Sequence, residues 1–346
     1  MKFTNRRTAS LLLASLASLA SLLLTTTADA QLDIDTAAAI TKNPNLYSLL
    51  VNRNNQTLCE RYFNGHHQTD LMNDQSLTKS VVSLLIGIAI EKGKIKSLDQ
   101  PIVDFFPELR SDSDKRKPGI TIRQIMNQAS GLYHEDLGTL GGIPSYLNAP
   151  SQKDLVLHSP LNAEPGATWH YSNAATHLLS VILSIATGTD TYTFAKTNLF
   201  DPLNITTLEW MKMQDGYYDG CGLLSIRLRS EDMLKIGLLL LHHGRHNDKQ
   251  LVPAKYVDEV LNPEKDYHTD WGFPQSTYAL CYYHTTVDGT PITYGMGWGG
   301  QFLIIIPSLN TVIVANENPA DATAIRQSVN FTAKIFPFLL QQLRPR

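Results

Sequence analysis

Cysteine and charged residues are both scarce in this sequence. Its 346 residues include three cysteines, Cys59, Cys221 and Cys281. They are too few for a disulfide framework and too scattered for a Cys-x-x-Cys metal site, although an oxidising compartment would allow one disulfide, whose pairing the spacing leaves open. Charged residues make up 18%, the formal net charge is −3, and no basic block is interleaved with aromatics. Nucleic acid is therefore excluded as a partner.

Several catalytic and metal-binding patterns are missing as well. The sequence has neither a Gly-x-Ser-x-Gly elbow nor a His-Glu-x-x-His helix. His242, His243 and His246 resemble a metal cluster, but adjacent histidines diverge on a helix and no acidic residue has the spacing of a zinc site. We predict no metal and no cofactor. The apolar fraction of 43% is that of an ordinary globular chain with a sizeable core.

The first thirty residues have the pattern of a secretory signal peptide. Lys2, Arg6 and Arg7 precede an apolar run over residues 11–24, and residues 28–30 form a small-x-small cleavage site. A membrane anchor is the alternative, but serines interrupt the run and it is short for a span of roughly 20 residues. A twin-arginine signal is less favoured, because apolar residues do not follow the arginines. We predict cleavage after Ala30, a periplasmic or secreted protein, and no membrane span in the mature chain.

The strongest strand patterns lie near the two ends of the mature chain, and a strong helix pattern lies between them. Alternating segments around residues 52–55 predict a β-hairpin, and residues 302–306 and 311–314 predict another. Residues 80–90 are apolar on almost every face and meet Gly93, which predicts a buried helix with a glycine at its C-terminus.

Further helices are predicted over residues 177–186, 230–242 and 322–343. In the last of these, one side is predicted to pack on the sheet through five apolar residues, Ile325, Val329, Ala333, Phe336 and Leu340. The chain is therefore predicted to be α+β, with a sheet region of about residues 31–70 and 215–346 and a mostly helical region of about residues 71–214. Segments distant in the chain would meet around a cleft.

The first chemical motif is Ser76-Leu77-Thr78-Lys79 at the start of the predicted buried helix. A spacing of three places the hydroxyl and the amine on one face, one turn apart. A desolvated lysine can be neutral often enough to accept the serine proton and so activate a weak nucleophile. Alone, the motif is equally compatible with a helix-capping serine and an exposed lysine.

Two later motifs change that balance. In Tyr171-Ser172-Asn173, the tyrosine hydroxyl could relay a proton and the Asn173 amide could bind substrate or hold the lysine. Residues 295–301, Gly-Met-Gly-Trp-Gly-Gly-Gln, lead into a strand instead of a helix, so a dinucleotide-binding loop is excluded. Glycines there would let substrate approach the backbone, and the N–H groups of Gln301 and Ser76 could form an oxyanion hole.

In this order and spacing, the three motifs resemble those of the class C β-lactamase-related serine hydrolases. The similarity extends to residues 97–101, 106–109, 130–132 and 165–166, and is greatest to the branch of the 6-aminohexanoate-dimer hydrolases and family VIII carboxylesterases. The resemblance implies an antiparallel sheet flanked by helices, a mostly helical second region and an active site between them. It also implies an acyl-enzyme on Ser76, with Lys79 as base, Tyr171 as proton relay and Asn173 in support.

The third motif departs from the family pattern. True β-lactamases and DD-peptidases have Lys-Thr-Gly or His-Thr-Gly where this chain has Trp298-Gly299-Gly300. An apolar wall replaces a carboxylate anchor, which favours a small-molecule ester, amide or peptide-like substrate over a β-lactam. A peptidoglycan DD-peptidase, a β-lactamase and a non-catalytic penicillin-fold sensor remain alternatives, and the sequence leaves the oligomeric state open.

Overall fold

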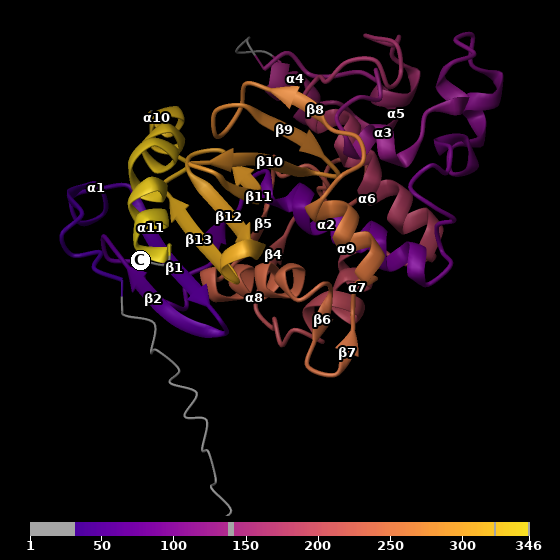
Figure 1. Ribbon diagram of the computed structural model, residues 1–346. Coiled ribbons are helices and arrows are strands. Elements are labelled where there is room, and N and C mark those ends of the chain that lie inside the picture. The colour runs from indigo at the N-terminus through magenta and orange to yellow at the C-terminus, as the bar shows by residue number, and fades with distance from the viewer. Residues whose placement is uncertain (1–31, 138–141, 322, 345–346) are drawn as a thin grey trace, which may run out of the picture. The chain divides into compact units, whose positions relative to one another are not determined.

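A computed structural model describes residues 32–137, 142–321 and 323–344, so the predicted signal peptide and its cleavage site lie outside the described residues. Residues 31–346 form one compact unit. Its main feature is an eight-stranded antiparallel sheet, with the helices on its two faces (Figure 1). In spatial order the strands are β2 (Gln56–Tyr62), β1 (Leu46–Arg53), β13 (Thr311–Glu317), β12 (Gln301–Ile306), β11 (Thr290–Gly297), β10 (Tyr282–Val287), β9 (Ser276–Ala279) and β8 (Tyr267–Thr269).

Two small sheets accompany the large one. The first joins three strands, in the order β3 (Met72–Asn73), β5 (Ile226–Leu228) and β4 (Glu209–Trp210). The second is the pair β6 (Arg245–His246) and β7 (Lys249–Gln250). The three-stranded sheet matters for the site, because β3 leads directly into the serine motif and β5 follows the loop that packs beneath it.

The helices cover the length of the described chain. They are α1 (Ala38–Thr41), α2 (Leu77–Glu91), α3 (Ile122–Met126), α4 (Gly142–Leu147), α5 (Gln152–His158), α6 (Asn173–Thr187), α7 (Thr191–Ala195), α8 (Ser230–Leu241), α9 (Ala254–Leu261), α10 (Ala324–Asn330) and α11 (Phe336–Leu343). None of the helices in the described ranges is long and apolar enough to cross a membrane. The α+β class predicted from the sequence is confirmed, as are both predicted hairpins and the buried helix α2.

Both faces of the large sheet are covered at its centre, which explains the uninterrupted apolar run over residues 302–306 of β12. On β12, Leu303 and Ile305 belong to the core shared with α2, α6 and α8, whereas Phe302, Ile304 and Ile306 belong to the core shared with the C-terminal helices. Alternate residues of a strand point to opposite faces, so a segment buried on both sides is expected to be a near-continuous apolar run. The sheet thus separates two cores, and α2 lies in the larger one.

The predicted packing face of the C-terminal helix is wrong in its first half. Ile325 and Val329 are 63% and 58% exposed, and Ala333 is exposed too, whereas Phe336 and Leu340 are buried as predicted. The cause is a π-helical turn at Phe331–Ile335 between α10 and α11. A wider turn shifts the register of the buried face, so that Ala324 and Gln327 face inward instead.

Glu317, at the end of β13, is buried beneath Gly300 of the third motif. Burial raises the pKa of Glu317 to about 8, against a smaller opposing effect of the neighbouring Asn43 amide. The ordinary pKa is 4.5, so between these values the folded protein retains a proton that the unfolded chain releases. Stability conferred by this site is therefore full below pH 4.5 and falls as the pH rises towards 8.

We predict that Glu317→Gln removes this pH dependence, because the amide is neutral throughout. Relative to the variant, the wild type should lose up to about 4 kcal/mol of unfolding free energy between pH 5 and pH 8. Urea denaturation at each pH measures the effect, and the variant serves as the control for all other titrating groups. Equal slopes for the two proteins would contradict the prediction.

Candidate active site

Ser76 occupies a tight turn immediately before α2. The preceding residue, Gln75, has a left-handed backbone with φ of +52°, a conformation that is costly for a residue with a side chain. Two glycines pack on this turn from other segments: a Cβ on Gly222 would lie 2.9 Å from the Ser76 Cα, and one on Gly297 would lie 2.9 Å from the Gln75 Cβ. The strained turn is thus held between the loop before β5 and the end of β11.

Lys79 lies one turn along α2, as predicted, and its ammonium group is buried. Its Nζ donates to Ser76 Oγ at 3.0 Å and to Asn173 Oδ1 at 2.6 Å, and makes a short hydrogen bond to the Cys221 carbonyl. An ammonium has three protons to donate. Three oxygen acceptors from three segments therefore satisfy it completely.

This arrangement favours the charged form of Lys79. Burial by itself would lower the pKa of Lys79, but the facing groups Tyr171, Cys221 and Asp219 raise it, and the net direction is upward. Each of the three oxygen acceptors stabilises the ammonium form, which accounts for the upward direction. The neutral form that a general base requires is thus a minor species near neutral pH.

Tyr171 is the second group in contact with the Ser76 hydroxyl. Its hydroxyl donates to Ser76 Oγ at 2.7 Å, and the Lys79 Nζ is 4.7 Å from the centre of its ring. The indole of Trp271, from the loop between β8 and β9, stacks on the same ring at 4.6 Å. Trp169 adds an edge contact to Trp271 at 6.0 Å. Tyr171 is therefore oriented by an aromatic cluster that no sequence motif predicted.

Asn173 is the first residue of α6, and a buried carboxylate holds it there. Glu135 accepts hydrogen bonds from the N–H groups of Asn173 and Ala174, at 2.9 and 3.0 Å. The Ser172 hydroxyl caps the same turn by accepting from Ala175 N–H at 2.8 Å. A negative charge at a helix N-terminus is favourable, because it accepts hydrogen bonds from the unpaired N–H groups and interacts with the positive end of the helix dipole. Glu135 thus orients the residue whose amide oxygen binds Lys79.

The third motif forms the hairpin between β11 and β12. Trp298 is 52% exposed, whereas Gln301 is buried opposite Gly297 in the ladder. Gly299 and Gly300 have φ of +80° and +89°, a region that favours glycine. The Gln301 amide donates to the carbonyls of Glu317 at 2.6 Å and Gly299 at 3.2 Å. Its side chain therefore stabilises the turn, while its predicted role as an N–H donor to substrate stays a prediction.

Asp219 shapes the loop that provides the Cys221 carbonyl. Its buried carboxylate accepts hydrogen bonds of 2.7–3.0 Å from the N–H groups of four loop residues, Cys221, Gly222, Leu224 and Ser225. The loop is also bound to the nucleophile turn, because Gln75 N–H donates to Ser225 Oγ at 2.7 Å and Ile226 N–H donates to Thr78 Oγ1 at 2.9 Å. One carboxylate thus positions the backbone on which Ser76 and Lys79 rest.

The sequence motifs predicted the groups that meet at Ser76 but not the residues that hold them. Asp219-Gly220 is a turn dipeptide, which is the one local signal that this loop contains. Glu135 and Trp271 have no such signal, because their partners are 38 or more residues away in the chain.

Chemically, this arrangement can support acyl transfer, with the Ser76 hydroxyl as the attacking group. This hydroxyl is in contact with two groups able to move a proton, and no third-motif cation accompanies them. Within the described ranges, no group of three or more His, Cys, Asp or Glu residues could hold a metal ion. The three cysteines are buried and free, so the disulfide that the sequence allowed is not formed.

Comparison with known proteins gives a consistent result. The β-lactamase family model matches residues 47–330. A 6-aminohexanoate-dimer hydrolase of Paenarthrobacter ureafaciens is 25% identical over 290 residues, or 77% of this chain and 71% of the relative. These matches confirm the predicted resemblance.

Solved structures of low sequence identity show the same fold. A Bacillus anthracis protein assigned to the 6-aminohexanoate-dimer hydrolases superposes with a TM-score of 0.72 at 18% identity, covering 88% of this chain and 82% of that one. A D-stereospecific amidohydrolase of a Streptomyces species superposes with a TM-score of 0.64 at 16% identity, covering 84% and 93%.

We predict that Asp219→Asn slows covalent labelling of Ser76 by a fluorophosphonate roughly 10- to 100-fold. The cause is the loss of charged hydrogen bonds, which are worth about 1.5–3 kcal/mol. The amide would turn N–H groups towards the loop N–H donors and displace the Cys221 carbonyl. Asp201→Asn, at an exposed carboxylate paired with Lys196, is the matched control. An unchanged labelling rate in a folded Asp219→Asn protein would contradict the prediction.

Proposed function

The chain belongs to the β-lactamase family, and from that membership we propose that it is an exported serine hydrolase that cleaves an ester or amide bond through an acyl-enzyme on Ser76. The position of one atom, Ser76 Oγ, is the main support for the proposal. Ser76 Oγ lies 3.0 Å from Lys79 Nζ and 2.7 Å from the Tyr171 hydroxyl. Both groups that would move a proton during acyl transfer are within reach of the nucleophile.

In the proposed reaction, Ser76 Oγ attacks the substrate carbonyl carbon as its proton passes to neutral Lys79. Tyr171 relays a proton to the leaving oxygen or nitrogen, which departs as an alcohol or an amine. Water then attacks the acyl group, the Oγ regains a proton, and the acid is released. Because the pKa of Lys79 is raised, acylation should accelerate as the pH rises.

The oxyanion of the tetrahedral intermediate would be bound by backbone N–H groups. We propose Ser76 N–H as one donor and Gln301 N–H as the other. The close packing of Gly297 against Asp74 and Gln75 supports a position of this hairpin beside the nucleophile turn. A pair of such donors would contribute strongly to stabilising the transition state, since removing one typically costs roughly 2.7–4 kcal/mol of that stabilisation.

The proposed substrate is a small ester, amide or peptide-like molecule with an apolar part. Trp298 and Trp271 are 52% and 39% exposed, and an exposed indole offers an apolar, stackable surface. The names of two relatives, a 6-aminohexanoate-dimer hydrolase and an amidohydrolase, support hydrolysis of this kind. Export rests on the pattern of residues 1–30 in the sequence.

Ser76→Ala should abolish covalent labelling by a fluorophosphonate and lower turnover of a chromogenic ester by roughly 10⁴-fold or more, because the attacking oxygen is gone. Intact-mass spectrometry and a stopped-flow assay measure the two effects. Ser111→Ala, at a surface serine, is the matched control.

Three results with the wild type would contradict the proposal. The absence of both labelling and turnover would favour a non-catalytic sensor. Stoichiometric labelling by a fluorescent penicillin, slowly released and without ester turnover, would favour a DD-peptidase or sensor, and rapid β-lactam hydrolysis would favour a β-lactamase.

Trp298→Lys should raise kcat/KM for a carboxylate-bearing chromogenic cephalosporin on the order of tenfold, since an ammonium at this partly exposed position can pair with the carboxylate. Trp298→Phe, which keeps an aromatic ring without a charge, is the control. If the lysine variant gains no more than the phenylalanine variant, the third motif does not determine carboxylate recognition.

A further inference from the structure

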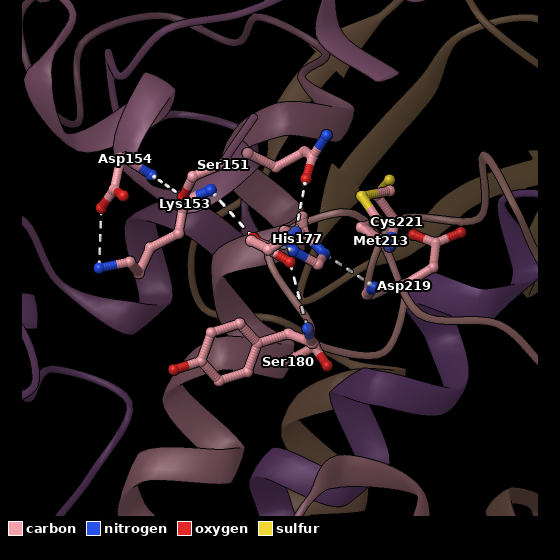
Figure 2. Close-up of polar contacts among 12 residues, drawn as sticks. Ser151, Lys153, Asp154, His177, Ser180, Met213, Asp219 and Cys221 are labelled. Carbon is pink, nitrogen blue, oxygen red and sulfur yellow. Dashed lines mark hydrogen bonds and ion pairs between the residues drawn. The ribbon is translucent and has the colours of Figure 1, made fainter. Parts of the chain in front are cut away.

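His177 is the centre of a buried polar network that the proposed reaction does not use (Figure 2). Its side chain is completely buried in α6, and its Nε2 lies 3.0 Å from Asp215 Oδ2. Asp215 also accepts from Lys153 N–H at 3.0 Å and from Tyr217 N–H at 3.2 Å. Burial opposes ionisation of Asp215, but His177 and these N–H groups lower its pKa overall, so it is a carboxylate.

The contacts of His177 determine which ring nitrogen carries the proton. Gly220 N–H donates to Nδ1 at 3.2 Å, so Nδ1 must present its lone pair. The ring proton is therefore on Nε2, from which it is donated to the Asp215 carboxylate. The ring links two segments, because one nitrogen binds the carboxylate while the other binds the backbone of the loop before β5.

Gly220 is held against α6 with little space around it. A Cβ at this position would lie 2.9 Å from the Ser180 Cβ and 3.1 Å from the His177 carbonyl. The next residue is Cys221, whose carbonyl accepts from Lys79. The bond from His177 to Gly220 therefore places the peptide that leads directly to an acceptor of the buried ammonium.

The helix connects this bond with a second acceptor. Asn173 and His177 are four residues apart and so lie on the same face of α6. Asn173 binds Lys79 directly through Oδ1, whereas His177 reaches it through Gly220 and Cys221. Two of the three oxygens around Lys79 are thus positioned by a single face of α6.

We propose that His177, as the Nε2–H tautomer oriented by Asp215, is a positioning residue for the proposed acyl transfer: it places the Cys221 carbonyl and thereby holds the Lys79 ammonium at Ser76 Oγ. The inference rests on the proposed function of Ser76 and Lys79. It differs from a purely structural role, which would require the contact with Asp215 but not the contact with Gly220.

A matched pair of substitutions separates these two contacts. In His177→Asn the amide oxygen can take the place of Nδ1 and accept from Gly220, while the contact with Asp215 is lost. In His177→Gln the amide can reach Asp215, while the acceptor for Gly220 is lost. For each variant, kcat, KM and the rising limb of the pH profile would be measured with a chromogenic ester, together with Tm.

His177→Gln should lower kcat roughly 10- to 100-fold with KM nearly unchanged, because a displaced Lys79 no longer lies in line with Ser76 Oγ. The rising limb of its pH profile, which reports deprotonation of Lys79, should move to lower pH, since the ammonium loses an acceptor. His177→Asn should keep most of kcat and the wild-type limb. Equal losses, the opposite order, or losses that follow Tm alone would overturn the proposal.

The wild type provides a second test that needs no substitution. Long-range ¹H–¹⁵N NMR should find the His177 proton on Nε2 and a hydrogen-bonded lone pair on Nδ1. A proton on Nδ1 would overturn the proposal even if neither variant folds. Failure of the proposed function is a separate result, because a wild type without turnover or labelling of Ser76 would show it before any comparison of variants.

Discussion

A lysine ammonium buried in the core must be fully hydrogen-bonded, and the site depends on that requirement. A buried charge without partners would cost several kcal/mol, so Lys79 needs three acceptors. They come from Ser76 at the start of α2, from Asn173 on α6 and from the Cys221 carbonyl. Three segments distant in the chain are thereby fixed at one nitrogen, and the nucleophile is the acceptor that substrate would reach.

Buried carboxylates set the acceptors in place without touching Lys79. Glu135 binds the first N–H groups of α6, Asp219 gathers the loop that presents Cys221, and Asp215 orients His177 against the same loop. Each carboxylate accepts from backbone N–H groups that would otherwise lack partners. The charges that shape the site therefore fix backbone geometry. Among the residues that the structure describes, only Lys79 and Tyr171 are ionisable groups in contact with the Ser76 hydroxyl.

Local patterns explain the parts of the fold that could be predicted. The apolar run of α2 with its terminal Gly93, and the hairpin strands β12 and β13, are signals that each lie within about fifteen residues of the chain. The packing face of α10 was mispredicted because a π-helical turn changes the register, and no local pattern marks that turn. Trp271 was missed because its significance arises only from stacking on Tyr171, a hundred residues earlier.

The sequence by itself determined which chemical groups the site contains: a serine and a lysine one helical turn apart, a tyrosine and an asparagine after them, and a glycine-rich hairpin without a cation. Only the tertiary structure decided that Lys79 is surrounded by three oxygens and rests charged, and that an aromatic cluster orients Tyr171. The physical reason is that the Cys221 acceptor is a backbone carbonyl, a group that every residue has. Its position follows from Asp219 and His177, and no residue pattern at Cys221 could reveal it.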